Sequence, residues 1–484
     1  MTPTENIPVI IILFGGSGDL AHRKLYPALF NLYQQNVIHD RFAVIGTARR
    51  PWSHDYLREQ IKESIEETHD QVNEDDLKHF LSHFYYQSHD VTHVSHYMAL
   101  KKMAAHLDET YHADGNRIFY MAMAPRFFGT IATHINDQHL IGSGFNRLVV
   151  EKPFGRSLAS AQKLNDEIRR SFSEDQVYRI DHYLGKEMVQ NILPLRLTNP
   201  LIKNVWNHDF VKNIQITLGE QLGVEARGGY YETSGALRDM VQNHVFQIAT
   251  LLMMPEPEAL SATAIHAAKQ MLLDHIVLPD PDQMRKHFVR GQYLGNDDTF
   301  AYRKEKNVAP DSTTETFAAG EIKFNAGPLA GVPVYFRTGK RMKEKCSRVD
   351  IVLKHMTNLY GRAHSNNISI IIDPVSEFYL TINGKKIQES GIRREDLKYR
   401  FTTAEMAQVP DGYERLLHDV FVADTTNFTH WSELKRSWQF IDAAEAFWQS
   451  DEKTVPMPQY APFKMGPKEA DHIFENPHDH WIYR

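Results

Sequence analysis

The chain has 484 residues, of which 42% are hydrophobic and 24% are charged, a composition typical of globular proteins and not of disordered ones. This length favours two or three domains. The net charge of −7, from 61 acidic and 54 basic side chains, disfavours bulk attraction to nucleic acid or to an anionic membrane. The single cysteine, Cys346, excludes an internal disulfide framework and cysteine-rich metal sites.

The N-terminal residues and the lengths of the apolar segments bear on where the protein works. The chain begins MTPTE, without the basic segment of a signal peptide. No apolar run approaches the ~20 residues that a bilayer crossing needs. We therefore expect a cytoplasmic protein that binds neither nucleic acid nor a membrane, and we assign no metal ligands.

The first 150 residues alternate between short apolar segments and amphipathic segments. The pattern predicts helices at residues 20–35 and 56–69, and strands at residues 9–14, 42–45, 84–87, 118–124 and 148–150. The continuous apolar run at 9–14 is typical of a strand buried on both faces. Such alternation predicts right-handed βαβ units on a parallel sheet.

The later part of the chain is rich in consecutive strands. They are predicted at residues 211–218, 316–324, 332–337, 349–353, 368–372 and 378–382, and helices at 186–197, 235–253, 413–421 and 432–448. Asn383-Gly384 predicts a hairpin turn, because both residues tolerate positive φ. Consecutive strands without intervening helices indicate an antiparallel sheet with one covered face.

A glycine-rich turn directly follows the first strand. Its residues are Gly15, Gly16, Ser17, Gly18, Asp19 and Leu20. From Gly16 to Ala21 the pattern is G-x-G-x-x-A, in which Gly16 permits the turn, Gly18 lets the backbone approach a pyrophosphate and Ala21 allows close packing. The alternative is a glycine-rich loop that binds nothing, but the position between a strand and a helix favours a dinucleotide site.

These features together predict the domain organisation. We expect an α/β, Rossmann-type dinucleotide-binding domain over residues 1–180 and a larger α+β domain, built on a mainly antiparallel sheet, over residues 181–484. The second strand runs into Arg49 and Arg50 and has no acidic residue at its end. Arginines there suit the 2′-phosphate of NADP, whereas an acid would suit the ribose of NAD; a pair of solvated loop arginines is the alternative.

Further polar residues are clustered in the second domain. Asp181, His182, Tyr183 and Lys186 follow one another closely, and His182 and Lys186 would share a face if a helix began there. Such a face could hold a phosphate, although a solvated helix start is the alternative. His244 lies in an otherwise apolar helix, where a histidine is more often a core residue. The basic run at residues 337–345, taken alone, is typical of a solvated turn.

Eight collinear segments together resemble the glucose-6-phosphate dehydrogenase family over nearly the whole chain. They are GGSGDLAHRKLYPALFNLY (15–33), YMAMAPRFFG (120–129), EKPFGRSLASA (151–161), RIDHYLGKEMVQNI (179–192), GGYYETSGALRDMVQNHVFQI (228–248), APDSTTETFAA (309–319), VYFRTGK (334–340) and YERLLHDVFVADTTNF (413–428). The string RIDHYLGKE is highly specific.

The resemblance implies oxidation of D-glucose 6-phosphate to 6-phospho-D-glucono-1,5-lactone with NADP⁺, the first step of the oxidative pentose phosphate pathway. It implies that His244 is the general base for the C1 hydroxyl and that Asp181 is its carboxylate partner. A base whose pKa is near the working pH suits this proton transfer, and a nearby carboxylate raises imidazole basicity.

The resemblance also implies the binding residues. Those for the phosphate are His182, Tyr183, Lys186 and Lys345; those for the sugar hydroxyls are Glu220, Asp239 and Lys340; Lys24 and Lys152 lie where cofactor and substrate meet; and Tyr120 and Arg49 line the cofactor site. Pro153 matches a switch proline of the family. His22 and Lys345 stand at positions where the family varies. A homodimer or higher oligomer through the antiparallel sheet is implied, and Arg50 argues for NADP while leaving room for some use of NAD.

Two other functions remain as alternatives. A related sugar-phosphate or glucose dehydrogenase would differ in its preference between glucose and glucose 6-phosphate. A catalytically silent NADP(H)-sensing regulator would need only the glycine turn, so the presence of His244 together with Asp181 and Lys186 argues against it.

Overall fold

A computed structural model of the protein describes residues 6–356, 364–451 and 457–483. Its described residues form two compact units. The N-terminal unit contains Met1–Gly155, Ala159–Gly185 and Pro410–Trp431, and the C-terminal unit contains Arg156–Leu158, Lys186–Val409 and Ser432–Arg484. The segment 410–431, which the sequence patterns placed in the second domain, thus belongs to the N-terminal unit. The reason is its apolar face, because Leu416, Leu417, Val420 and Phe421 are buried in the core of that unit.

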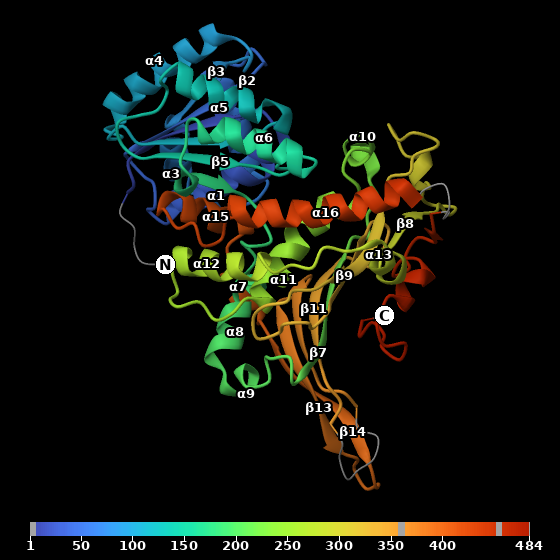
Figure 1. Ribbon diagram of the computed structural model, residues 1–484. Coiled ribbons are helices and arrows are strands. Elements are labelled where there is room, and N and C mark those ends of the chain that lie inside the picture. The colour runs from blue at the N-terminus through green and yellow to red at the C-terminus, as the bar shows by residue number, and fades with distance from the viewer. Residues whose placement is uncertain (1–5, 357–363, 452–456, 484) are drawn as a thin grey trace. The chain divides into compact units, whose positions relative to one another are not determined.

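The N-terminal unit is built on a six-stranded sheet in which every described pair is parallel (Figure 1). Its strand order is β3-β2-β1-β4-β5-β6, with β1 (Val9–Phe14), β2 (Phe42–Ala48), β3 (Phe84–Ser88), β4 (Arg117–Met121), β5 (Asn146–Val150) and β6 (Val177–Arg179). All six residues of β1 are buried. Alternate residues face opposite sides of a strand, so this central strand needs helices on both faces.

Helices cover the two faces of the parallel sheet. They are the π-helical turn η1 (Ala21–Leu25), α1 (Tyr26–Gln34), α2 (His54–Glu66), α3 (Glu74–Ser82), α4 (Val94–Tyr111), η2 (Pro125–Phe127), α5 (Phe128–Asp137), α6 (Leu158–Arg169), η3 (Glu174–Gln176) and α15 (Gly412–Phe421). Val9, Ile11 and Leu13 share a core with α1 and α15. On the other face, the ring of Phe14 lies 6.4 Å from that of Tyr97 in α4.

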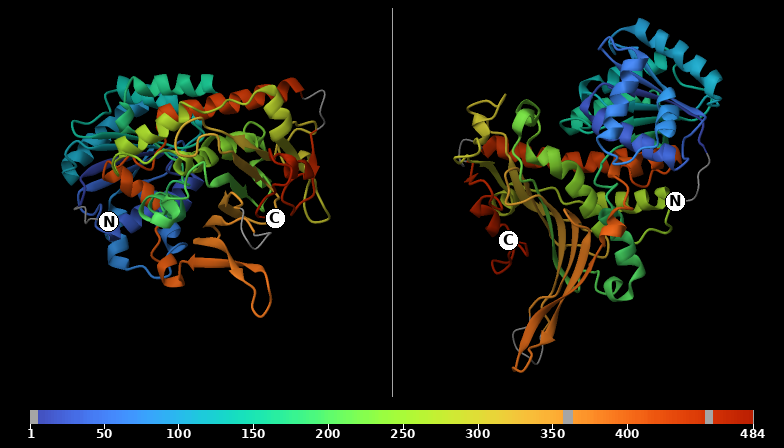
Figure 2. Two further views of the ribbon diagram at one scale, coloured as in Figure 1. Left: turned by 60° about the horizontal axis from the view of Figure 1, so that its bottom comes forward. Right: turned by 180° about the vertical axis from the view of Figure 1, so that it is seen from behind.

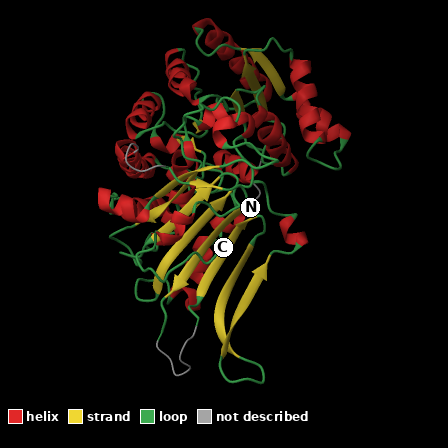
Figure 3. Ribbon diagram, turned by 90° about the vertical axis from the view of Figure 1, so that its right-hand side faces the viewer, coloured by secondary structure: helices red, strands yellow, loops and turns green. Residues whose placement is uncertain are grey.

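The C-terminal unit is built on a nine-stranded sheet, which Figures 2 and 3 show as a curved layer with helices packed against it. The strand order is β14-β13-β12-β11-β7-β10-β9-β8-β15, with β7 (Val211–Gly219), β8 (Val289–Tyr293), β9 (Phe317–Ile322), β10 (Val334–Gly339), β11 (Cys346–Leu353), β12 (Asn367–Asp373), β13 (Glu377–Lys385), β14 (Ile392–Arg400) and β15 (Gln459–Tyr460). Two described pairs, β7–β10 and β8–β15, are parallel and the others are antiparallel. The mainly antiparallel sheet predicted from the sequence is confirmed.

The helices of the C-terminal unit are mostly short. They are α7 (Glu187–Gln190), α8 (Ile192–Thr198), α9 (Pro200–Lys203), η4 (Glu225–Arg227), α10 (Gly228–Tyr231), the π-helical segment η5 (Leu237–Val245), α11 (Phe246–Met253), α12 (Ala262–Leu273), α13 (Pro281–His287), η6 (Tyr302–Lys304), α14 (Thr403–Met406), α16 (Trp431–Asp451) and η7 (Lys468–His472). In the described part of the chain, no helix is both long enough and apolar enough to span a membrane.

The hairpin formed by β13 and β14 corrects one prediction. Asn383 and Gly384 lie inside β13, paired with Arg394 and Arg393, and do not form the turn. The chain reverses after Lys385, where the N–H of Lys386 donates to the carbonyl of Gly391. Asn and Gly permit positive φ but do not require it, so strand pairing prevails at this position.

Candidate functional site

The glycine turn lies at the end of β1, as predicted, but its strained position is Gly15 and not Gly16. Gly15 has a φ of +96°, and a Cβ there would lie 2.1 Å from the carbonyl oxygen of Ala122. Gly16 instead packs closely on Gly46, because a Cβ built at Gly16 would lie 2.9 Å from the Cα of Gly46. Only glycine adopts the backbone conformation of Gly15 without steric cost.

A cavity of about 640 Å³ opens at the carboxyl edge of the parallel sheet. Its walls come from the ends of four strands, with Gly15, Ser17 and Gly18 after β1, Thr47 to Arg50 at β2, His89 to Thr92 after β3, and Ala122, Met123 and Phe127 after β4. This edge is where parallel sheets bind nucleotides, and the volume lies in the range of small-ligand sites. Helical residues begin at Asp19, so a helix N-terminus lies at the cavity wall.

The turn fits a dinucleotide phosphate on steric grounds. A Cβ at Gly18 would approach the carbonyl oxygen of Gly15 to 3.1 Å, so a side chain here would be tightly packed, whereas glycine leaves the backbone open. Bound phosphate would face backbone N–H groups and the positive end of the helix dipole. Gly15, Ser17 and Gly18 of the predicted set line the cavity, whereas Asp19 is exposed and pairs with Arg23 at 3.5 Å.

The two arginines after β2 have different environments. Both are exposed and line the cavity. Arg50 donates from Nη1 to the carbonyl of Ser17 at 2.8 Å and lies 5.4 Å from the ring centre of Trp52. Arg50 therefore braces the glycine turn, and Arg49 lines the same cavity.

Several residues that line the cavity were not predicted from the sequence. His89 is buried, its pKa is lowered to about 4 by burial and then by His96, and its Nε2 has no hydrogen-bond partner among the described residues. Asp90 accepts from the N–H and the hydroxyl of Thr92, which lowers its pKa. The position after β3 was the available signal, because residues at the carboxyl ends of parallel strands meet at one edge.

Tyr120 lies inside the sheet on β4 and is 1% exposed. Its hydroxyl donates to Oε1 of buried Glu151 at 2.6 Å, and the Tyr413 hydroxyl reaches Oε2 at 3.5 Å. Burial raises the pKa of Glu151 to about 7 despite these two hydroxyls and the charge of Lys152. The Lys152–Pro153 peptide that follows is cis.

Residues 181–185 form a hydrogen-bonded turn in the N-terminal unit. The N–H of Leu184 donates to the carbonyl of Asp181, and Oδ1 of buried Asp181 accepts from the N–H of Tyr183 at 3.0 Å. Helix α7 begins only at Glu187, so the predicted helical face shared by His182 and Lys186 is wrong. Gly185 packs so closely on Gly412 that a Cβ would lie 2.5 Å from the carbonyl oxygen of Gly412, which explains the glycine at this position.

Segment 410–431 contributes side chains beside this turn. The ring of Tyr413 stacks nearly parallel to that of His182, with centroids 6.3 Å apart. Asp411 accepts from Nζ of Lys24 at 3.0 Å, and both side chains are partly exposed. Neither Asp411 nor Tyr413 was predicted, because their proximity depends on the return of the chain to the N-terminal unit.

In the C-terminal unit, two of the predicted phosphate lysines meet at one carboxylate. Nζ of Lys186 lies 3.2 Å and Nζ of Lys345 lies 2.9 Å from Oδ2 of Asp373. Burial raises the pKa of Asp373, but the two ammonium groups outweigh it and hold the pKa below its usual value. No local pattern pointed to Asp373, the last residue of β12.

The three predicted sugar-binding residues also lie together in the C-terminal unit. The Lys340 ammonium pairs with Glu220 and lies 3.6 Å from Oδ2 of Asp239. It also lies 5.4 Å from the centre of the Tyr231 ring. Lys340 follows β10 and Glu220 follows β7, and these parallel strands are in register up to Gly339 and Gly219.

His244 lies in the π-helical segment η5 and its side chain is fully buried. The segment packs on β7 and β10. A π-helical turn inside a longer helix is uncommon and is frequently found at functional sites. The helix predicted over residues 235–253 is present, and η5 and α11 are its two parts.

Comparisons with known proteins agree along the whole chain. The family model "Glucose-6-phosphate dehydrogenase, NAD binding domain" matches residues 12–191, and "Glucose-6-phosphate dehydrogenase, C-terminal domain" matches residues 193–482. The glucose-6-phosphate 1-dehydrogenase of Streptococcus pneumoniae is 45% identical, with 98% of this chain and 97% of the relative covered. That of Bacillus subtilis is 44% identical, with 99% of each covered.

A solved structure of glucose-6-phosphate dehydrogenase in complex with its substrate glucose-6-phosphate is 30% identical. It has a TM-score of 0.89 and covers 98% of this chain and 100% of its own. The structure of the enzyme from Mycobacterium avium is 29% identical, with a TM-score of 0.84 and 99% of each chain covered. The chain belongs to the glucose-6-phosphate dehydrogenase family.

Proposed function

We propose that the chain oxidises D-glucose 6-phosphate to 6-phospho-D-glucono-1,5-lactone, the first step of the oxidative pentose phosphate pathway. The C1 hydroxyl loses its proton to a base, and a bound nicotinamide dinucleotide accepts the hydride from C1. The observation that carries this proposal is the pair of ammonium groups, Lys186 and Lys345, within 3.2 Å of the Asp373 carboxylate. Two cations held together in this way suit the dianionic phosphate of a sugar phosphate.

The phosphate-binding role of the lysines rests on their charge and position. An ammonium group acts as a point charge toward phosphate and does not impose the planar geometry of arginine. Asp373 keeps the two cations close to each other in the free protein, which lowers the cost of bringing them together on binding. His182 and Tyr183 are proposed as further donors to the same phosphate.

The sugar hydroxyls are assigned to the Lys340 cluster. Glu220 and Asp239 offer carboxylate acceptors, and Lys340 offers a donor, within one group of contacting side chains. A sugar ring presents hydroxyls that both donate and accept, so a mixed set of this kind recognises it better than one type of charge. Lys24 and Lys152 are proposed to line the region where cofactor and sugar meet, and Tyr120 is proposed to line the cofactor site.

His244 is proposed as the general base and Asp181 as its carboxylate partner. Departure of a hydride makes C1 electron-poor, so the hydroxyl proton must be removed in the same step. A neutral imidazole is the side chain best suited to accept a proton near neutral pH. A carboxylate partner favours the imidazolium that forms and holds the ring in one orientation.

The cofactor is a nicotinamide dinucleotide, and we propose that NADP is preferred with some use of NAD. Support comes from Arg49, which lines the cavity, and from the lack of an acidic residue at the end of β2. A guanidinium can bind a 2′-phosphate through two hydrogen bonds. The reaction is proposed to take place in the cytoplasm, where the single buried thiol of Cys346 stays reduced.

A homodimer is proposed through the antiparallel sheet. On β13 and β14 the apolar side chains of Ile382, Leu397 and Tyr399 are exposed. Exposed apolar side chains gathered on neighbouring strands are typical of surfaces that another subunit covers.

The proposal is tested by absorbance of the reduced nicotinamide with glucose 6-phosphate and each cofactor. We expect turnover with NADP⁺, weaker turnover with NAD⁺, and very poor turnover when glucose replaces glucose 6-phosphate. Equal rates with glucose and glucose 6-phosphate would contradict a phosphate-binding site at Lys186 and Lys345.

The base assignment is tested with His244→Asn. We expect kcat to fall by roughly 10²–10⁴-fold with little change in substrate affinity, since a positioned base contributes about that factor. The exposed His275 provides a control, because His275→Asn should retain activity. A fully active His244→Asn variant would refute the assignment.

A further inference from the structure

Three side chains that could together bind a metal ion lie near the start of β2, in the N-terminal unit. His39 and Asp40 are in the loop between α1 and β2, and His79 is in α3. Nδ1 of His39 lies 2.8 Å, and Nε2 of His79 lies 3.8 Å, from Oδ1 of Asp40. One ligand atom from each of the three side chains lies within 4.8 Å of the other two.

Tyr33 holds both imidazoles in place. Its hydroxyl bonds to Nδ1 of His79 at 2.8 Å, which leaves Nε2 of His79 directed at Asp40. Its ring stacks on that of His39, with centroids 4.6 Å apart and planes inclined by 9°. A hydrogen bond to the distal nitrogen of a histidine is the usual device that orients a metal ligand.

The backbone of the loop is fixed as well. Oδ1 of Asn6 accepts from the N–H groups of His39 at 3.0 Å, of Asp40 at 3.1 Å and of Arg41 at 3.4 Å. The ligand-bearing loop is thus fastened to the segment that precedes β1. Side chains on a fixed backbone lose less conformational entropy on binding than those on a free loop.

From these contacts we propose that His39, Asp40 and His79 form a binding site for a divalent transition-metal ion of the zinc, cobalt and nickel class. Two imidazoles and one carboxylate are the donor set that such ions prefer, whereas calcium and magnesium prefer oxygen alone. Ligand nitrogens about 2.0–2.1 Å from zinc lie roughly 3.3 Å apart in a tetrahedral site. Small side-chain rotations therefore bring the three groups to coordination distance, and water completes the shell.

The site lies at the opposite end of β2 from Arg49. The strand runs from Phe42 to Ala48, which at about 3.3 Å per residue is roughly 20 Å. The bound ion would join the α1–β2 loop to α3 and so stabilise the N-terminal unit by mass action. It would take no part in the oxidation of the sugar.

The test is a titration of the full-length protein with Co²⁺, followed by its visible absorption, and with Zn²⁺ by calorimetry. We expect the wild-type protein to bind one more equivalent than His79→Ala or His39→Ala. The control is His106→Ala, an exposed histidine in α4, which should match the wild type. Tyr33→Phe keeps the ring but removes its hydroxyl from His79, and should weaken binding about 10- to 100-fold.

Two further measurements separate a true site from general surface binding. The melting temperature should rise with Zn²⁺ in the wild type and in His106→Ala but not in His79→Ala, and all variants should retain turnover with glucose 6-phosphate. Anomalous scattering from a zinc-soaked crystal should place the ion against Nε2 of His79. Equal stoichiometry in the wild type and His79→Ala, or an ion placed elsewhere, would overturn the proposal while leaving the proposed reaction untouched.

Discussion

Single residues around the glycine turn shape the cavity at the carboxyl edge of the parallel sheet. Gly15 carries the positive φ, and its missing Cβ leaves room for the carbonyl of Ala122. Arg50 uses its guanidinium on the backbone of Ser17, while neighbouring Arg49 lines the open cavity. Neighbours in sequence therefore have separable roles, and substitutions can distinguish them.

Arg49→Ala should raise KM for NADP⁺ more than KM for NAD⁺. Loss of a charge-assisted hydrogen bond costs about 1.5–3 kcal/mol, or one to two decades in affinity. Steady-state kinetics with both cofactors measures the difference. Arg50→Ala serves as the comparison and should affect both cofactors alike, because it removes the brace on Ser17. Equal effects of Arg49→Ala on the two cofactors would show that Arg49 does not bind the 2′-phosphate.

Gly15→Ala should destabilise the N-terminal unit by about 3 kcal/mol or more. The left-handed backbone costs roughly 1–2 kcal/mol and the clash with Ala122 adds roughly 1–3 kcal/mol. The matched control is Gly331→Ala, since Gly331 has a φ of +76° but nothing within 4 Å of a Cβ. In urea unfolding, Gly331→Ala should lower the free energy of unfolding only by the cost of the left-handed backbone. A Gly15→Ala variant no less stable than Gly331→Ala would contradict the steric argument.

Glu151→Gln should change how stability depends on pH. The folded-state pKa of Glu151, about 7, lies above its value in the unfolded chain, so the folded protein holds the proton more tightly. Ionisation therefore costs stability as pH rises from about 4.5 through 7, reaching about 3 kcal/mol at pH 8. Relative to the wild type, the variant should gain stability between pH 4.5 and pH 8, as measured by urea unfolding. A difference independent of pH would show that Glu151 ionises normally.

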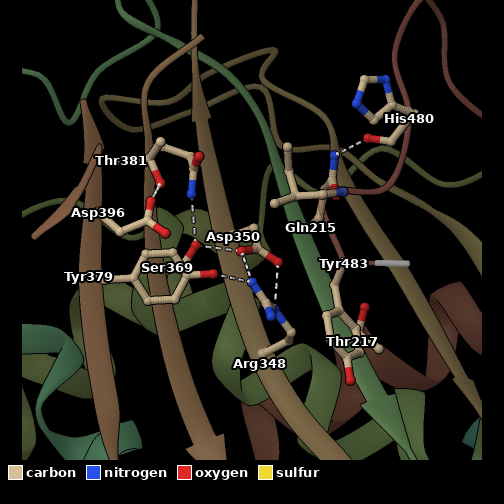
Figure 4. Close-up of polar contacts among 12 residues, drawn as sticks. Gln215, Thr217, Arg348, Asp350, Ser369, Tyr379, Thr381, Asp396, His480 and Tyr483 are labelled. Carbon is tan, nitrogen blue, oxygen red and sulfur yellow. Dashed lines mark hydrogen bonds and ion pairs between the residues drawn. The ribbon is translucent and has the colours of Figure 1, made fainter. Parts of the chain in front are cut away.

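At the scale of elements, strand pairing overrides local turn preference and places charges inside the sheet. Figure 4 shows a network that joins β11, β12 and β13. Arg348 donates to both oxygens of Asp350 and to the hydroxyl of Tyr379, and Ser369 donates to Asp350. Burial would lower the pKa of Arg348, but the Asp350 carboxylate outweighs burial and raises it.

Asp350→Asn should lower the free energy of unfolding by about 3–5 kcal/mol. Asp350 is 1% exposed and Arg348 is 8% exposed, so the substitution leaves a buried cation without its counterion. The control is Asp396→Asn on exposed β14, where Asp396 accepts from Thr381. That change should cost no more than about 0.5 kcal/mol in the same unfolding measurement. Similar costs at both positions would mean that the network contributes little.

At the scale of the whole molecule, the antiparallel sheet is the surface on which assembly is proposed. The hairpin of β13 and β14 extends beyond the other strands of its sheet, as Figure 1 shows. Its exposed side chains include Leu397 at 55% and Tyr399 at 45%. Exposed apolar side chains on a pair of neighbouring strands are typical of a surface that another subunit covers.

Leu397→Glu should convert a dimer into a monomer, because a buried charge at the subunit contact would be costly. Light scattering during size-exclusion chromatography measures the mass. Leu260→Glu is the control, since Leu260 is 83% exposed in the same unit but lies outside the hairpin. A wild type that is monomeric, or a Leu397→Glu variant that stays dimeric, would contradict this interface.

The sequence by itself determined the family, the reaction and most of the strands. Residues 9–14 were predicted as β1 with the observed bounds, and the glycine turn was placed correctly at its end. These features are local, because apolar periodicity and turn chemistry depend on neighbouring residues. The strand β14, IRREDLKYR, was not predicted, because its exposed, charged residues show no apolar periodicity.

Only the tertiary structure decided which distant residues meet. It brought Lys186 and Lys345 to Asp373, buried Glu151 against Tyr120, and added segment 410–431 to the N-terminal unit. These contacts depend on the path of the chain between segments far apart in sequence. Local patterns record which face of an element is apolar, but the identity of the partner on that face is set by packing of the whole unit.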